Sequence, residues 1–175
     1  MDCTYYGKIS FTVIIAIISI ISSLSCTPKY TQKQVSESQV IKYGPGSFLY
    51  RDKTIPENSA LRVFYYKPSG FTADSPIFFI LHGYGREADT SLYLAAISAE
   101  TFNFLLIVPE YSFKLFSTWE EYNYGNARKK PKELWTYFVN DRIFQFVKEL
   151  TKSRQDKYYL FGHSAGSQFV HRQLM

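Results

Sequence analysis

One serine has neighbours that could make it a nucleophile. Ser164 is the centre of the pentapeptide GHSAG, which follows the apolar segment KYYLF and precedes a segment with helical character. At a sharp strand-to-helix turn such a serine has a strained backbone, and side chains two residues away on either side would clash, so the pattern requires Gly162 and Gly166. The N–H of Ala165 would face a carbonyl oxygen that gains negative charge. The spacing predicts that Ser164 attacks an acyl carbon; the alternative is a tight turn whose glycines only allow close packing.

A second glycine-containing turn could complete an oxyanion site. HGYG (82–85) follows the apolar run IFFIL. Such a site needs a second N–H donor from the loop after an earlier strand, and Gly83 and Gly85 are expected to let the backbone turn its N–H groups toward a substrate. The N–H of Tyr84 is the predicted donor. His82 is predicted to support the loop by hydrogen-bonding its backbone, with acid–base work as the less favoured role.

Strands and helices must hold these two turns, and the hydrophobic pattern predicts them in alternation. The predicted strands are Ser47–Arg51, Leu61–Tyr66, Ile77–Leu81, Phe104–Val108 and Lys157–Phe161. The predicted helices are Ala88–Thr101, Lys132–Lys152 and Gln168–Met175. This order favours a mostly parallel sheet with helices on both faces, in which ligands bind beyond the carboxyl ends of the strands. Both glycine turns lie at such ends.

Longer stretches around the two turns resemble a known family. HGYG and GHSAG, about 80 residues apart, look like motifs of the α/β-hydrolase superfamily. More closely, PEYS (109–112), YNYGN (122–126) and YYLFGHSAGSQFVHR (158–172) are similar to esterases related to polyhydroxyalkanoate depolymerases and to feruloyl or acetyl-xylan esterases. The resemblance covers residues 61–175. It implies an α/β fold, an incomplete α/β-hydrolase domain over residues 47–175, serine ester chemistry on a small-molecule or polymer ester, and no cofactor.

The resemblance also implies an acid and a histidine after the serine, which this sequence does not contain in a suitable place. Only 11 residues follow Ser164, with no Asp or Glu among them and a single histidine, His171. Seven helical residues place His171 about 10 Å along the axis, beyond reach of the hydroxyl. His163 is expected to point away from the serine and pack beside the strands, and His82 lies on the oxyanion side. The chain is therefore expected to be the N-terminal part of a longer hydrolase and to have no useful turnover by itself.

The first 26 residues predict an export signal. Lys8 precedes the apolar run Phe11–Leu24, and small residues then lead to Cys26. A positive residue, a short apolar run and small residues are typical of a secretory signal peptide. The ending resembles a bacterial lipoprotein signal, in which the cysteine becomes the lipidated first residue of the mature chain. An exported lipoprotein, periplasmic or at the cell surface, is the favoured interpretation.

Two other interpretations of this segment stay open. The uncharged stretch Ile9–Pro28 just reaches the length that spans a bilayer, so an uncleaved signal anchor would fit, as would plain secretion. All three export the domain. Residues 27–46 are polar without apolar periodicity and are predicted to be a tether between membrane and domain.

Composition excludes several other classes. The 20 Lys and Arg against 15 Asp and Glu give a net charge of +5, with the only compact basic run at residues 128–130, so nucleic-acid binding is not favoured. The two cysteines, Cys3 and Cys26, cannot make a disulfide scaffold. There is no Cys-x-x-Cys or His-x-x-x-His pair, so no metal site is predicted.

A binding protein without catalysis is the main alternative from another class. Trp119, Tyr122 and Tyr124 could form a stacking surface for sugars or phenolic groups, although such aromatics more often pack a loop. A peptidase or a thioesterase also remains open, because the serine turn indicates acyl chemistry and not the leaving group.

Three polar residues near strand ends are not predicted to be catalytic. Glu110 could contact a substrate, but capping a loop is the favoured role. Asn123 and Asn126 are predicted to form turns and to fix their loop through their amides.

Overall fold

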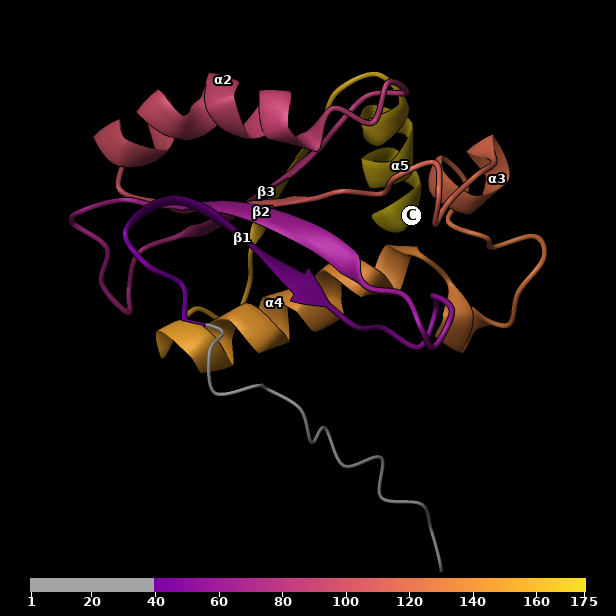
Figure 1. Ribbon diagram of the computed structural model, residues 1–175, viewed down its shortest axis with the longest axis horizontal. Coiled ribbons are helices and arrows are strands. Elements are labelled where there is room, and N and C mark those ends of the chain that lie inside the picture. Colours follow the sequence, from indigo (N-terminus) through magenta and orange to yellow (C-terminus); the bar gives the residue numbers. More distant parts are fainter. Residues whose placement is uncertain (1–39) are drawn as a thin grey trace, which may run out of the picture. The chain divides into compact units, whose positions relative to one another are not determined.

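The computed structural model of the protein describes residues 40–175, which form a five-stranded sheet with helices (Figure 1). The strands are β1 (Gly44–Tyr50), β2 (Leu61–Lys67), β3 (Ile77–Leu81), β4 (Leu105–Pro109) and β5 (Tyr159–Gly162). The helices are α2 (Ala88–Thr101), α3 (Trp119–Tyr122), a 3₁₀ turn η1 (Lys132–Leu134), α4 (Tyr137–Thr151) and α5 (Ala165–Gln173). The predicted signal, Cys26 and most of the predicted tether lie outside the described residues. No helix in the described range is long and apolar enough to span a bilayer.

The sheet is mixed, with strand order β1-β2-β4-β3-β5. The expected parallel pairing holds for β3 with β4 and for β3 with β5, whereas β1 with β2 and β2 with β4 are antiparallel. The reason lies in the connections. Helix α2 joins β3 to β4 and helix α4 lies between β4 and β5, but no helix separates the first three strands. Parallel neighbours need a long crossover, so the short early connections reverse the chain instead.

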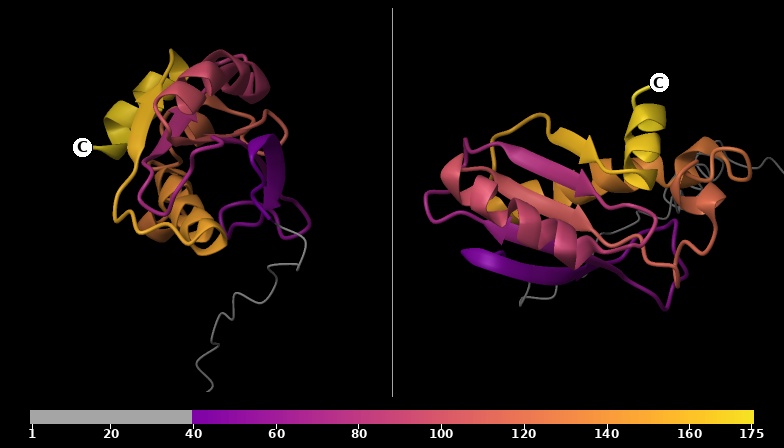
Figure 2. Two further views of the ribbon diagram at one scale, coloured as in Figure 1. Left: turned by 90° about the vertical axis from the view of Figure 1, so that its left-hand side faces the viewer. Right: turned by 90° about the horizontal axis from the view of Figure 1, so that it is seen from above.

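Helices cover both faces of the sheet (Figures 1 and 2). Strand β4 shows this most clearly, because all five of its residues are buried. Leu106 and Val108 pack against α2, and Leu105 and Ile107 face the larger cluster that contains α4. A run that is apolar on both sides is what a central strand between two helical layers requires.

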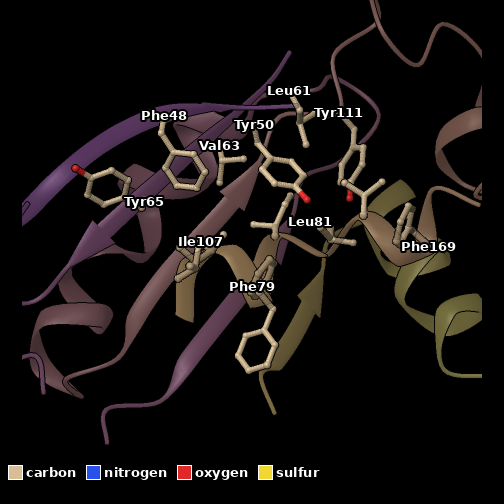
Figure 3. Close-up of a cluster of buried hydrophobic side chains, with 14 of the residues drawn as sticks. Phe48, Tyr50, Leu61, Val63, Tyr65, Phe79, Leu81, Ile107, Tyr111 and Phe169 are labelled. Carbon is tan, nitrogen blue, oxygen red and sulfur yellow. The ribbon is translucent and has the colours of Figure 1, made fainter. Parts of the chain in front are cut away.

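The larger core lies between the sheet and helices α4 and α5. Helix α4 contributes the buried side chains of Val139, Ile143 and Val147, and α5 contributes Phe169. Figure 3 shows the sheet side of this core, where Phe79 and other side chains of alternate strand positions point to the same face. The core therefore fixes the start of α5, and with it the turn that precedes α5.

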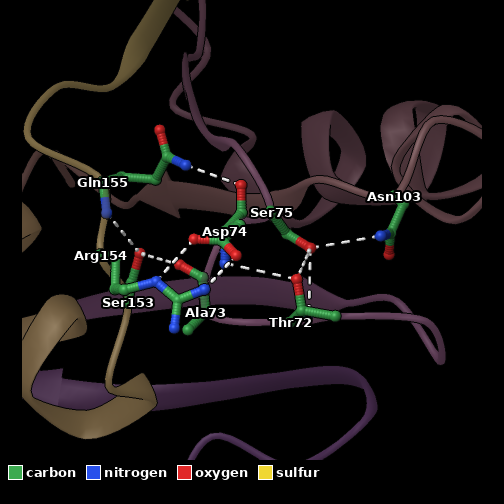
Figure 4. A network of polar contacts seen from close by, with 8 residues as sticks. All are labelled: Thr72, Ala73, Asp74, Ser75, Asn103, Ser153, Arg154 and Gln155. Atoms are coloured by element: carbon green, nitrogen blue, oxygen red, sulfur yellow. Dashed lines mark hydrogen bonds and ion pairs between the residues drawn. The ribbon is translucent and has the colours of Figure 1, made fainter.

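Polar contacts join the amino ends of the parallel strands β3, β4 and β5 (Figure 4). Before β3, the Asp74 carboxylate pairs with the Arg154 guanidinium, which precedes β5. The Gln155 amide donates to the Asp74 carbonyl at 2.6 Å, and the Arg154 N–H donates to the Ala73 carbonyl at 2.8 Å. On the other side the Asn103 amide, before β4, donates to the Ser75 hydroxyl at 3.2 Å. These contacts align β5 and β4 with β3 at the ends remote from the two glycine turns.

Three predicted elements begin at least three residues away from the prediction, and one of them is α5, which begins at Ala165 and not at Gln168. The predicted helix Lys132–Lys152 is interrupted, because Trp135 is extended with ψ 137° and separates η1 from α4. The Thr136 N–H donates to the Gly125 carbonyl at 2.8 Å instead of continuing a helix, so a tertiary contact overrides the apolar spacing. Strand β1 begins at Gly44, three residues before the predicted strand and within the predicted tether.

Candidate active site

Ser164 has the strained backbone that the sequence predicts. It is an exposed residue directly before α5, with φ 52° and ψ −113°. A positive φ is uncommon outside glycine and costs on the order of 1–3 kcal/mol unless the surroundings enforce it. The surroundings here are a strand on one side and a helix on the other. The hydroxyl-bearing residue is thus presented at the carboxyl end of β5.

The two glycines of the pentapeptide are required by close backbone packing. A Cβ on Gly162 would lie 2.3 Å from the carbonyl carbon of Gly166. A Cβ on Gly166 would lie 2.2 Å from the carbonyl oxygen of Leu81, at the end of β3. The steric clash expected from the sequence is therefore present, and β3 takes part in it.

The HGYG turn lies directly against the serine. A Cβ built on Gly83 would lie 3.7 Å from the Ser164 Cβ and 3.2 Å from the His163 Nδ1. The His163 N–H also donates to the Leu81 carbonyl at 3.0 Å, which joins the two turns. His163 is exposed and lies against Gly83, so the expectation that it packs beside the strands is wrong. The two glycine turns are thus in contact, and a Cβ at position 83 would require a small shift of the His163 ring.

In the turn after β3, the unusual backbone conformation lies at Arg86 and not at the two glycines that were expected to provide it. The Arg86 N–H donates to the Gly83 carbonyl at 3.2 Å, which makes Tyr84 and Gly85 the central residues of a four-residue turn. The residue with positive φ is Arg86, at 64°, and neither Gly83 nor Gly85 has one. A Cβ on Gly85 would contact only the flexible Glu87 side chain.

The N–H groups of Tyr84 and Ala165 are free of the hydrogen bonds that close the turn and the helix. In a four-residue turn the N–H of the second residue, here Tyr84, takes no part in the closing hydrogen bond. The first N–H groups of a helix have no acceptor in a preceding turn, and Ala165 is the first residue of α5. Gly83 lies against Ser164, so Tyr84 and Ala165 are the residues next to the two that approach each other. The arrangement can place negative charge beside a helix N-terminus.

His82 is a buried structural residue. Its Nδ1 lies 3.0 Å from the Gly83 carbonyl oxygen, and its Nε2 accepts the Tyr111 N–H at 3.0 Å. Burial lowers the pKa of His82 to about 4, and the neighbouring Arg86 charge acts in the same direction. The ring is neutral near pH 7 and both nitrogens have partners. The predicted supporting role fits this geometry, and a role as general base does not.

The loop after β4 holds the HGYG turn through contacts that the sequence analysis missed. The Tyr122 hydroxyl donates to the His82 carbonyl at 2.6 Å. The buried Arg86 guanidinium donates to the carbonyls of Tyr111 at 2.9 Å and Phe116 at 3.1 Å, and it lies 4.1 Å from the Tyr122 ring centre. These hydrogen bonds and the ring contact therefore fix the position of the HGYG turn.

A sequence signal for part of this loop did exist. Thr118 and Glu121 form a capping box, in which the Glu121 N–H donates to the Thr118 hydroxyl and the Thr118 N–H to the Glu121 carboxylate. The Thr-x-x-Glu spacing marks the start of α3 and could have located it. Arg86 gave no comparable signal, because an arginine after a turn is ordinarily exposed.

The aromatic residues of this loop do not form the stacking surface that the binding-protein alternative needs. Tyr122 is fully buried. Trp119 packs edge-on against Tyr124 with ring centres 4.9 Å apart, and the Arg172 guanidinium covers Tyr124 at 3.9 Å. Tyr122 and Tyr124 therefore pack the loop, whereas Trp119 stays 49% exposed.

The remaining polar residues have structural partners. The Asn123 amide donates to the Gln168 side chain on α5 at 3.1 Å, and Asn126 has a positive φ of 61° in a turn. Glu110 lies 4.0 Å from the Arg62 guanidinium. The turn-forming role predicted for the two asparagines is consistent with this, and Glu110 is part of an ion pair between β2 and the end of β4.

The described residues bring Ser164 and the HGYG turn together, and no histidine among them is placed to accept the proton of the Ser164 hydroxyl. Within residues 40–175 no hydrogen bond involves the Ser164 hydroxyl, and His171 is exposed on α5. A cavity of about 700 Å³ between α4, β5 and α5 is lined by residues such as Trp135 and Tyr158 and does not include Ser164. The described range also contains no cluster of three or more possible metal ligands.

Comparison with solved structures identifies the fold. No model of a known protein family matches the sequence, and no curated protein matches it. Poly(aspartic acid) hydrolase-1 from Sphingomonas sp. KT-1 is 35% identical with a TM-score of 0.69, over 75% of this chain and 51% of that one. A poly(3-hydroxybutyrate) depolymerase from Bordetella parapertussis is 28% identical with a TM-score of 0.69, over 76% of this chain and 47% of that one.

An acetyl xylan esterase from Aspergillus awamori shares the fold alone, with 14% identity and a TM-score of 0.56 over 73% of this chain and 46% of that one. The chain spans about half the length of these solved structures. The strained serine turn at the end of a parallel strand and the matched folds define the α/β-hydrolase fold. The chain belongs to the α/β-hydrolase superfamily and is similar to hydrolases and esterases that include the poly(aspartic acid) hydrolase and the poly(3-hydroxybutyrate) depolymerase.

Proposed function

We propose that the protein is a serine carboxylester hydrolase that works through an acyl-enzyme. The Ser164 oxygen attacks the acyl carbon while its proton passes to a base, and the oxyanion accepts hydrogen bonds from the N–H groups of Tyr84 and Ala165. The alcohol leaves with the proton from the base. Water then attacks the acyl-enzyme and releases the acid and Ser164. The observation that carries the proposal is Ser164 at φ 52° in contact distance of the Gly83 turn.

We propose that the base and its acid come from a part of the whole protein outside these 175 residues. None of the three histidines is placed to serve: His82 is buried and engaged, His163 lies against Gly83, and His171 is exposed on α5. The solved relatives are about twice as long as the matched region, which leaves room for these groups. The 175-residue chain by itself is then expected to lack useful turnover, since a serine without its base keeps only binding and oxyanion effects.

Amide hydrolysis in an acidic polymer is a second candidate. The 35% identical relative is a hydrolase of poly(aspartic acid), a polyanion. The net charge of +5 of this chain would attract such a polymer. The same serine and oxyanion donors would serve, and only the leaving group would differ.

Covalent labelling tests the proposal on the chain as it is. A fluorophosphonate forms an oxygen–phosphorus bond with an activated serine and releases fluoride, and the proton goes to buffer or added imidazole. We expect Ser164 to be labelled slowly. A positioned base contributes a factor of ~10²–10⁴ to such a rate, and we expect added imidazole to raise the labelling rate about tenfold.

Two serine variants control the experiment. Ser164→Ala should abolish labelling. Ser167→Ala should not, because the Ser167 hydroxyl, one turn along α5, only donates to the Ser164 carbonyl at 2.6 Å. Equal labelling of Ser164→Ala and the unmodified chain would contradict the proposal, as would no labelling of a chain shown to be folded by circular dichroism.

A further inference from the structure

Two exposed aromatic rings pack against each other at the HGYG turn. Tyr84 is 61% exposed and Phe113 is 44% exposed. Their ring centres are 5.4 Å apart with an interplanar angle of 75°, an edge-to-face contact. Such a pair presents ring faces and edges that can contact a third ring.

The position of the pair ties it to the nucleophile. Tyr84 follows Gly83, where an added Cβ would lie 3.7 Å from the Ser164 Cβ. The N–H of Tyr84 is also one of the two proposed oxyanion donors. Tyr84 is therefore one residue from the position that lies against Ser164, and this is the basis for assigning the aromatic pair to a group attached to the reacting acyl carbon or to its leaving oxygen.

Buried contacts hold Phe113 in place. The Arg86 guanidinium lies 4.8 Å from the Phe113 ring centre and donates to the carbonyls of Tyr111 and Phe116, on either side of Phe113 in the chain. Arg86 itself is buried. Because the loop is already ordered, binding a ligand on this ring costs little conformational entropy.

The charges nearby favour a neutral ligand. The Glu87 carboxylate folds back on the turn, so that a Cβ on Gly85 would lie 3.0 Å from its Oε1. The Arg86 charge is buried under rings and bonded to carbonyls, and it is not offered to a ligand. A carboxylate on the substrate that approaches this turn would thus meet the like charge of Glu87.

We infer that Tyr84 and Phe113 bind a neutral ring-bearing group of the substrate and thereby set its specificity. This inference rests on the proposed function, because it needs Ser164 as the reacting group. It assigns a role to the Tyr84 side chain that is separate from that of its N–H.

Three phosphonofluoridates that differ only in one substituent on phosphorus test the inference. The substituents are phenyl, methyl and carboxymethyl, and the rate of Ser164 labelling by each is divided by the rate of its hydrolysis in buffer. For the unmodified chain we expect the phenyl probe to exceed the methyl probe by about five- to tenfold, a gain of the size that one aromatic contact provides. The carboxymethyl probe should be the slowest.

Variants then assign the preference to the two rings. Tyr84→Ala and Phe113→Ala should each reduce the phenyl-to-methyl ratio to about twofold or less. Tyr93→Ala, at an 80% exposed tyrosine on α2, is the matched control and should leave the ratio unchanged. If Phe113→Ala unfolds, Phe113→Leu takes its place, because leucine keeps the apolar contact with Arg86 but has no ring. We expect it to lower the phenyl-to-methyl ratio as well.

The outcomes separate the inference from the proposed function. An unchanged ratio in Tyr84→Ala and in the Phe113 variants, with Ser164 still labelled, overturns the inference alone. A carboxymethyl probe that is the fastest overturns the preference for a neutral group. Failure of all three probes to label Ser164 contradicts the proposed function instead.

Discussion

At the scale of single residues, the conformation of Ser164 depends on two glycines that touch backbone rather than side chains. Replacing Gly166 by alanine would place a Cβ 2.2 Å from the Leu81 carbonyl oxygen, which only a shift of α5 away from β3 could relieve. We expect Gly166→Ala and Gly162→Ala each to lower the free energy of unfolding by at least about 2 kcal/mol in urea titrations. Gly85→Ala is the control and should cost less than about 1 kcal/mol, because its new Cβ meets only the mobile Glu87 side chain. Equal losses at all three positions would contradict the packing described here.

His82 makes the stability depend on pH. Its folded pKa of about 4 lies below the usual value of 6.5 because the ring is buried. The unfolded chain therefore binds a proton that the folded chain does not, so stability is lost as the pH falls from about 6.5 to 4 and changes no further below that. Between about pH 7 and pH 5 the loss should be on the order of 2 kcal/mol.

The His82→Gln variant isolates this contribution. Glutamine does not titrate, so the part of the pH dependence due to His82 should disappear even though the variant is less stable at both pH values. Urea unfolding at the two pH values gives the comparison. An unchanged pH dependence in the variant would show that His82 is not buried and neutral.

The sequence could predict those residues whose requirement is steric and local. Gly162, Gly166 and the exposed serine follow from a turn between a strand and a helix, and the structure shows the clash that excludes a Cβ. Arg86 could not be predicted, because its role comes from carbonyls 25 and 30 positions away along the chain. His163 was misplaced since its neighbour across space is Gly83 and not the strand beside it in sequence.

At the scale of elements, the HGYG turn is held by α3 and by the loop that joins β4 to α3. The Tyr122 hydroxyl donates to the His82 carbonyl, and both residues are buried. Tyr122→Phe would leave that carbonyl without its partner, so we expect a loss of about 1–3 kcal/mol in the free energy of unfolding and slower labelling of Ser164. Tyr93→Phe, at an exposed tyrosine of α2, should change stability by less than about 0.5 kcal/mol. If Tyr122→Phe changed neither the free energy of unfolding nor the labelling rate, Tyr122 would not hold the HGYG turn.

Some strands and helices could be predicted from their own sequence, and others could not. Continuous apolar runs predicted β3 and β4 well, because burial on both faces leaves a pattern that no surface element shares. The antiparallel pairing of β1 and β2 depends on connections without helices, which a strand pattern does not display. The break before α4 depends on a hydrogen bond from Thr136 to the distant Gly125, so its apolar spacing extended the predicted helix too far.

At the scale of the whole molecule, the sheet ends at a strand that pairs on one side. Within residues 40–175 β5 pairs only with β3, and Tyr159 and Phe161 on β5 are exposed. The matched region is about half of each solved relative. Both facts fit the proposal that the base and acid come from the rest of the protein.

Export remains a proposal that rests on the first 26 residues. If Cys26 is lipidated, the protein should fractionate with membranes after expression in a bacterium, and Cys26→Ser should release it to the soluble fraction or leave it unprocessed. Cys3→Ser, at the other cysteine, is the control and should not change the fractionation. If the Cys26→Ser protein had the processed size and still fractionated with membranes, lipidation would be contradicted. If it fractionated with membranes at the full size, the signal anchor would be favoured.

The central claim is that the serine turn and the HGYG turn form one oxyanion site. The most direct measurement is the amide spectrum of the ¹⁵N-labelled chain before and after phosphonylation of Ser164. We expect the N–H resonances of Tyr84 and Ala165 to move downfield as they donate to the phosphonyl oxygen, while that of Tyr93 on α2 stays in place. If the Ala165 resonance moves and that of Tyr84 does not, the HGYG turn supplies no donor; if neither moves, the claim fails.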